Sequence, residues 1–134
     1  MTLFEDCTEL ARFVRGEADP ASFSHREHVR MGFDLLRRYD FVETALCYSR
    51  ALSAMTAKIG KPERFHQTTT IAFLSLIAER LETFEGADFE SFAQSNPHLS
   101  DQSVLTRIYR PERLASASAR RTFLLPTPDT SLTS

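Results

Sequence analysis

Three of the four histidines in the chain stand near the starts of two predicted helices. His25 and His28 are three residues apart, and His66 follows much later. Residues at this spacing share one face of an α-helix, so His25 and His28 could bind one ion together. A third imidazole from another helix would leave room at the ion for water or substrate, as in many catalytic zinc sites. Because imidazole suits Zn, Fe, Cu or Ni better than Ca or Mg, the three residues predict a divalent transition-metal site.

The residues around the histidines suggest supporting roles. The partial positive charge of a helix N-terminus opposes a bound cation, and a nearby carboxylate would relieve that opposition. Glu27 is the nearest carboxylate in sequence and the candidate catalytic group, and Glu63 is the alternative. We expect Thr69 and Thr70 to hydrogen-bond the histidines, and Glu27 or Thr70 to position a water molecule.

A second hypothesis needs no metal. The two helix N-termini, with Arg26, Lys61 and Arg64 close in sequence, would form a pocket for a small anionic molecule. His25 or His66 could then act as a general acid or base.

Two further interpretations remain open. The histidines could be partly buried side chains, hydrogen-bonded to the backbone or to Thr69 and Thr70, because a short HxxH pattern is frequent. The chain could also be an interaction protein without a small-molecule site, using its apolar surface to form a homodimer.

Four long helices are expected to carry these residues. Apolar residues recur at helical spacing in residues 3–14, 24–38, 40–59 and 64–84. Ser24 and Glu27 form an S-x-x-E capping box, and Asp40 precedes Glu43 in the same way. Gly60, followed by Pro62, is typical of a helix end. Residues 64–84 are apolar on more than one side, which predicts the central helix and puts His66 in its first turn.

The short connections favour antiparallel neighbours. The starts of the helices at residues 24–38 and 64–84 should then lie at the same end, which gathers the three histidines. We therefore predict an all-α, up-and-down bundle of about four main helices, with short C-terminal helices after Gly86. Residues 1–125 would be one domain, and the Pro/Ser/Thr-rich residues 126–134 a disordered tail.

Composition narrows the classes of protein. The net charge of −2, with neutral histidines, argues against a nucleic-acid surface. No apolar run approaches the roughly 20 residues of a membrane span, and the acidic first residues do not resemble a secretory signal. Cys7 and Cys47 lie far apart and show no metal-binding spacing. We expect a cytoplasmic protein, not bound to a membrane or to nucleic acid, with a small-molecule ligand as a candidate partner.

Three motifs resemble a family of small, uncharacterised bacterial proteins. They are F-x-H-x-E-H-V at residues 23–29, G-K-x-x-x-F-H-x-T-x-T at residues 60–70 and R-P-E-R-L at residues 110–114. The resemblance spans about residues 20–125, and Phe65 stands where the family pattern has tyrosine, which removes one hydroxyl group. It implies a recurring all-helical protein type and no particular reaction. It supports one set of residues: His25, Glu27, His28, His66 and Thr70.

Overall fold

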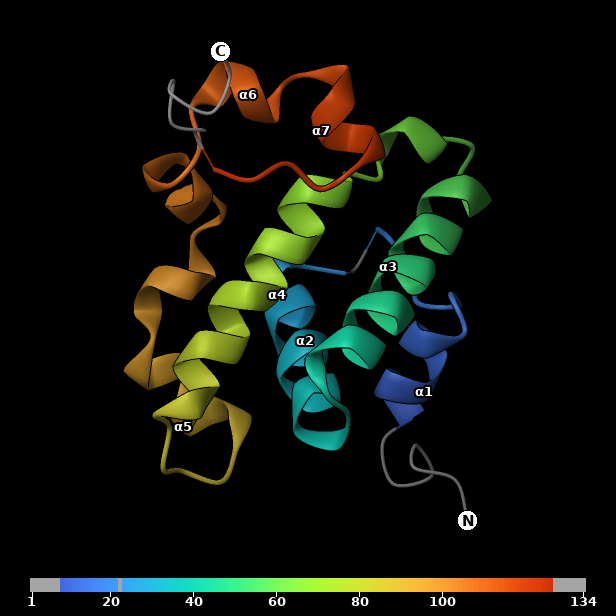
Figure 1. Cartoon of the computed structure of the whole chain (residues 1–134). Coiled ribbons are helices and arrows are strands. Elements are labelled where there is room, and N and C mark those ends of the chain that lie inside the picture. Colours follow the sequence, from blue (N-terminus) through green and yellow to red (C-terminus); the bar gives the residue numbers. More distant parts are fainter. Residues whose placement is uncertain (1–7, 22, 127–134) are drawn as a thin grey trace.

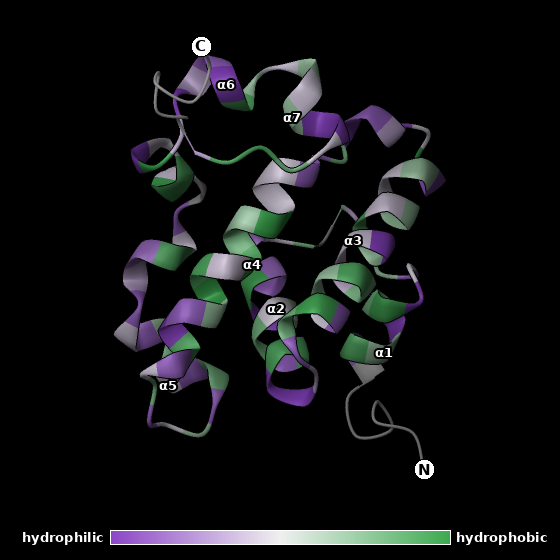
Figure 2. Cartoon of the chain, viewed as in Figure 1, coloured by the Kyte–Doolittle hydropathy of each residue, from purple (hydrophilic) through white to green (hydrophobic). Residues whose placement is uncertain are grey.

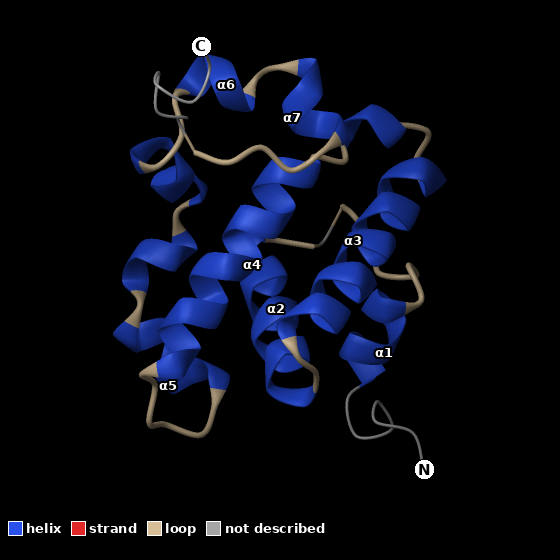
Figure 3. Ribbon diagram, in the orientation of Figure 1, coloured by secondary structure: helices blue, strands red, loops and turns tan. Residues whose placement is uncertain are grey.

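The computed structural model describes residues 8–21 and 23–126, and every regular element in these ranges is helical (Figure 3). The predicted all-α class is confirmed for this part of the chain. The α-helices are α1 (Thr8–Val14), α2 (His25–Arg38), α3 (Phe41–Lys58), α4 (Gln67–Glu82), α5 (Phe89–Ser95), α6 (Pro111–Leu114) and α7 (Ala117–Arg121). Three 3-10 helices are η1 (Pro62–Arg64), η2 (Pro97–Ser100) and η3 (Gln102–Arg107). The predicted helical residues 3–7 and residues 127–134 of the predicted tail lie outside the described residues.

The starts of α2 and α3 follow the predicted caps. The Ser24 hydroxyl accepts a hydrogen bond from the Glu27 backbone N–H at 3.3 Å, and the Asp40 carboxylate accepts one from the Glu43 N–H at 2.8 Å. Each bond satisfies a backbone donor that has no partner within the helix. After α3, Gly60 adopts a positive φ of 75°, which glycine reaches without the steric cost of a Cβ atom.

The start of α4 differs from the prediction. Residues 62–64 form η1, Phe65 is extended, and α4 begins at Gln67 rather than at residue 64. His66 is the N-cap of α4, so it precedes the helix instead of lying in the first turn. The physical reason is that its imidazole replaces the usual serine or aspartate: His66 Nδ1 accepts from the Thr69 N–H at 3.1 Å.

Helix α4 is central, as its apolar sequence predicted, and it contacts α2, α3, α7 and η3 (Figure 1). Hydrophobic and hydrophilic residues are interspersed along α3 and α4 (Figure 2). One core group joins α1, α2, α3 and α4 through Leu10, Phe13, Met31, Leu35, Tyr48, Ala51, Met55 and Leu74. A second group joins α2, α4, α5 and η2 through Val29, Phe33, Ile77, Phe92 and Leu99.

Helix α7 and the segment that follows it pack against the start of α4 (Figure 1). The fully buried Thr68 hydroxyl donates to the Thr122 carbonyl at 2.7 Å and accepts from the Leu124 N–H at 3.0 Å. This single hydroxyl therefore ties the first turn of α4 to the segment that follows α7. No helix within residues 8–126 that the structure describes has the length and apolar character needed to cross a membrane.

Candidate functional site

A cavity of about 360 Å³ opens between α2, α3 and α4, and all three predicted histidines line it. Most of the other lining side chains are apolar or aromatic, and none is acidic. The lining residues are His25, His28, Tyr48, Leu52, Thr56, Arg64, Phe65, His66, Thr69, Thr70, Phe73, Leu74, Ile77 and Leu105. A concave, mostly apolar pocket with a few polar groups is the usual form of a small-molecule site.

His66 uses both of its ring nitrogens in the fold. Nδ1 accepts from the Thr69 N–H, so Nε2 carries the proton and donates to the Leu114 carbonyl at 2.7 Å. The backbone carbonyl of His66 accepts from the Thr70 hydroxyl at 2.7 Å. In this arrangement the imidazole has no lone pair left for a metal ion, and its role is to cap α4 and to hold the C-terminal segment.

His25 keeps one nitrogen available. Its Nε2 lies 2.9 Å from the Leu99 carbonyl oxygen, and because a carbonyl only accepts, Nε2 must donate. In the neutral ring Nδ1 then carries the lone pair, and it forms no hydrogen bond to another described residue. The edge of the His25 ring packs against Phe73, with ring centroids 5.0 Å apart.

His28 is a neutral imidazole in an aromatic setting. Burial, together with the nearby His25, lowers the pKa of His28 from 6.5 to about 4. Its ring packs edge-on against Phe23, with centroids 4.6 Å apart. The Tyr48 hydroxyl donates to the His28 carbonyl at 2.8 Å, so at 3.5 Å its oxygen can only accept from His28 Nδ1. His28 Nε2 is then the unprotonated nitrogen.

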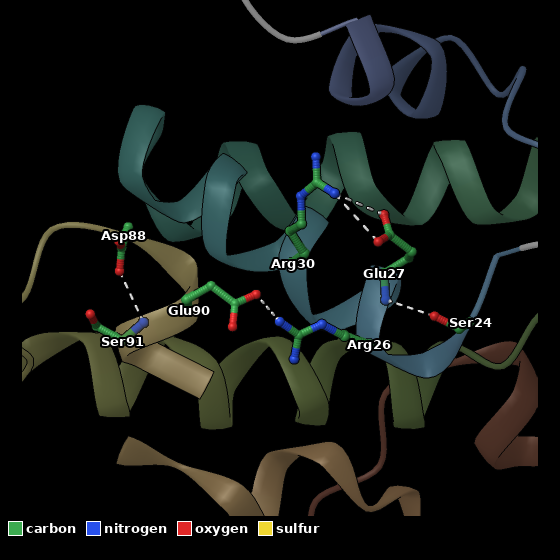
Figure 4. A network of polar contacts seen from close by, with 7 residues as sticks. All are labelled: Ser24, Arg26, Glu27, Arg30, Asp88, Glu90 and Ser91. Atoms are coloured by element: carbon green, nitrogen blue, oxygen red, sulfur yellow. Dashed lines mark hydrogen bonds and ion pairs between the residues drawn. The ribbon is translucent and has the colours of Figure 1, made fainter. Parts of the chain in front are cut away.

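The candidate catalytic residue Glu27 lies away from this cavity. Its carboxylate is 3.4 Å from the Arg30 guanidinium (Figure 4). Both side chains line a second hollow, which includes Glu9 and Arg12 of α1. Arg30 also pairs with Glu9 at 2.7 Å. The capping bond from the Glu27 backbone is present, but its side chain is directed to arginine rather than to the histidines.

The basic residues of the predicted anion pocket are dispersed. Arg26 pairs with Glu90 (Figure 4). It also lies over the Phe89 ring, 5.0 Å from its centroid, so it belongs to the contact with α5. Lys61 is exposed and does not line the cavity, and Arg64 alone of the three does so. The anion hypothesis therefore rests on one arginine, because the other two side chains are held elsewhere or face solvent.

Within the described part of the chain, no group of three or more His, Cys, Asp or Glu side chains is arranged to hold a metal ion. Glu63, the alternative carboxylate, does not line the histidine cavity, and its backbone carbonyl accepts from the Arg120 guanidinium at 2.7 Å. The arrangement offers an apolar chamber with unprotonated imidazole nitrogens and one guanidinium.

Sequence reasoning missed two contributors to the site. Tyr48 belongs to the apolar pattern of residues 40–59, which does not reveal that its hydroxyl contacts both the backbone and the ring of His28. Leu105, from the weakly patterned C-terminal region, closes part of the wall. Neither position carries a local motif that would have revealed it.

In comparisons with known proteins, no family model, no curated protein and no solved structure matches the chain.

Proposed function

We propose that the protein binds a small amphipathic carboxylate in the histidine-lined cavity, without a metal. The observation that carries this proposal is a mostly apolar chamber, lined by three imidazoles, with the Arg64 guanidinium on its wall. In this proposal α2, α3 and α4 follow the up-and-down order expected from their short connections, which brings the starts of α2 and α4 to one end.

The lining residues support an apolar body for the ligand. Leu52, Phe73, Leu74 and Ile77 offer hydrocarbon surface, and contact with them removes apolar ligand surface from water. A volume of 360 Å³ holds about a dozen non-hydrogen atoms, at about 30 Å³ each as in liquid water. A carboxylic acid with a chain of eight or nine carbons fits this size.

Arg64 supports a carboxylate. Its side chain is exposed and forms no ion pair with another described residue, unlike Arg26 and Arg30. A guanidinium presents paired donors that match the two oxygens of a carboxylate. Since no acidic side chain lines the cavity, an anionic ligand meets no like charge there.

Calorimetric titration with nonanoate tests this proposal. We expect saturable binding to the wild-type protein, and about three- to fivefold weaker binding to Arg64→Ala, because an exposed ion pair contributes modestly. Arg121→Ala is the matched control, since Arg121 is exposed, lies in the last turn of α7 and does not line the cavity. Absence of nonanoate binding, or equal losses in the two variants, would contradict the proposal.

Metal binding is the second candidate function, with His25 and His28 as the two remaining protein ligands. Each ring has one nitrogen without a hydrogen bond to another described residue, and the two rings are close enough that His25 lowers the pKa of His28. Such a pair would bind Zn, Fe, Cu or Ni with water or a ligand carboxylate completing the coordination. Metal analysis of untagged protein tests it: stoichiometric metal that is lost in His28→Phe supports this candidate, and metal-free protein with no thermal shift on metal addition contradicts it.

A further inference from the structure

The hydrogen bonds of the three histidines determine which ring nitrogens are free to accept a hydrogen bond from a ligand. His66 has no free nitrogen, because it accepts from Thr69 and donates to Leu114. His25 donates to the Leu99 carbonyl. Because the Tyr48 hydroxyl already donates to the His28 carbonyl, its oxygen can only accept a hydrogen bond from His28 Nδ1. The protons of His25 and His28 are thus directed into the fold, and each ring retains one lone pair.

These lone pairs are accessible. The buried side-chain atoms that lack a partner among the described residues are Ser49 Oγ and His98 Nε2. His25 Nδ1 and His28 Nε2 are not among them, so each reaches solvent, and the cavity is the hollow that both rings line. A lone pair in an apolar chamber loses stabilisation when a ligand displaces water without offering a donor in exchange.

We infer that the ligand carries, besides its carboxylate, a neutral hydrogen-bond donor such as a hydroxyl group, which the unprotonated nitrogens of His25 and His28 accept. This inference rests on the proposed function and specifies the ligand class for the same cavity. The donor is neutral because no carboxylate lines the cavity to offset the cost of burying an ammonium group. The low pKa of His28, about 4, keeps its acceptor nitrogen unprotonated near neutral pH.

Calorimetric titration with four carboxylates tests whether the ligand needs a neutral hydrogen-bond donor. The compounds have the same number of non-hydrogen atoms and are nonanoate, 8-hydroxyoctanoate, 7-methoxyheptanoate and 8-aminooctanoate. The hydroxyl compound can donate and accept, the methoxy compound can only accept, and the amino compound is a cation at its far end. We expect 8-hydroxyoctanoate to bind most tightly, about tenfold more tightly than 7-methoxyheptanoate, and the amino compound to bind more weakly than the hydroxyl compound.

The outcomes distinguish the two proposals. If nonanoate binds and 8-hydroxyoctanoate binds no more tightly, the inference about the donor is wrong and the proposed function stands. If none of the four compounds binds, both are wrong. Tightest binding of the amino compound would overturn the claim that the donor is neutral.

A variant and a spectroscopic measurement complete the test. His28→Phe keeps a flat ring and removes the acceptor, so the ratio of 8-hydroxyoctanoate affinity to nonanoate affinity should decrease in this variant. Because His28 is largely buried, the melting temperature of the variant is measured first. Long-range ¹H–¹⁵N correlation spectra of the wild-type protein should show unprotonated Nδ1 in His25 and unprotonated Nε2 in His28. The opposite tautomer in both rings would overturn the inference even if the variant does not fold.

Discussion

The two ends of α4 are held in different ways. At its start, Thr68 and His66 reach backbone groups of residues 114–124 through hydrogen bonds of 2.7 to 3.0 Å. Near its other end, aromatic rings from α2, α5 and the segment after α4 pack together. Their centroid separations run from 5.0 to 6.3 Å, among Phe33, Phe84, Phe89 and Phe92.

The cavity lies beside the start of α4, the end that hydrogen bonds hold. Hydrogen bonds fix the direction of a side chain and require a partner, whereas apolar packing mainly requires the right volume. At the start of α4 the orientation of His66 is determined by the bonds of both ring nitrogens. The phenylalanine end, by contrast, is held mainly by apolar packing, and the Arg37 guanidinium lies 5.2 Å from the centroid of the Phe33 ring. Three changes test this division.

Phe92→Ala should have the largest effect on stability. Phe92 is fully buried among Phe33 and Phe84, and removal of such a ring costs about 3 to 5 kcal/mol in lost burial and cavity formation. Urea unfolding measures the loss, and nonanoate affinity should stay unchanged while the protein is folded. Phe123→Ala, at a residue that is 39% exposed, is the control for a surface ring. A large loss of affinity in Phe92→Ala would break the proposed division between the two ends.

Acidification should act on the cavity side through His28. Its pKa is about 4 in the folded protein against 6.5 for the free side chain, so between these values the unfolded chain binds more protons. The free energy of unfolding therefore falls as the pH falls from 6.5 towards 4, by up to about 3 kcal/mol. Urea titrations at several pH values measure this slope. His28→Phe should make the free energy of unfolding depend less on pH, and Phe92→Ala should lower that free energy at every pH by the same amount. An unchanged pH dependence in His28→Phe would contradict the attribution of the slope to His28.

Thr68→Val should have a smaller effect on stability and should also weaken nonanoate binding. The change keeps the shape of the side chain and leaves the Thr122 carbonyl and the Leu124 N–H without their partner, which costs about 2 kcal/mol. Because the same turn carries Thr69 and Thr70 on the cavity wall, nonanoate affinity should fall as well. Thr83→Val, at an exposed residue after α4, is the matched control. Lowered stability with full affinity would mean that the C-terminal segment does not shape the cavity.

The sequence was most informative where a local rule applies. Ser24 and Asp40 are common N-cap residues, and α2 and α3 begin directly after them. The same reasoning missed the cap of α4, because histidine is not among the preferred N-cap residues and the preceding residues 62–65 resemble a continuation of the helix. The expectation that the three histidines gather in one region needed only helix order and spacing. Their ring protons depend on Leu99, Tyr48 and Leu114, which are 20 to 74 residues away in the chain and show no periodic pattern.

The distance in sequence between Thr68 and its partners has a consequence for folding kinetics. The bonds to Thr122 and Leu124 close loops of 54 and 56 residues, and His66 closes one of 48 to Leu114. Loops of this length carry an entropic cost that local helix formation does not, so these contacts form slowly compared with α2 or α3 alone. During synthesis α2 and α3 can pack together early, while the hydrogen bonds that hold the start of α4 form only after residue 124 has left the ribosome.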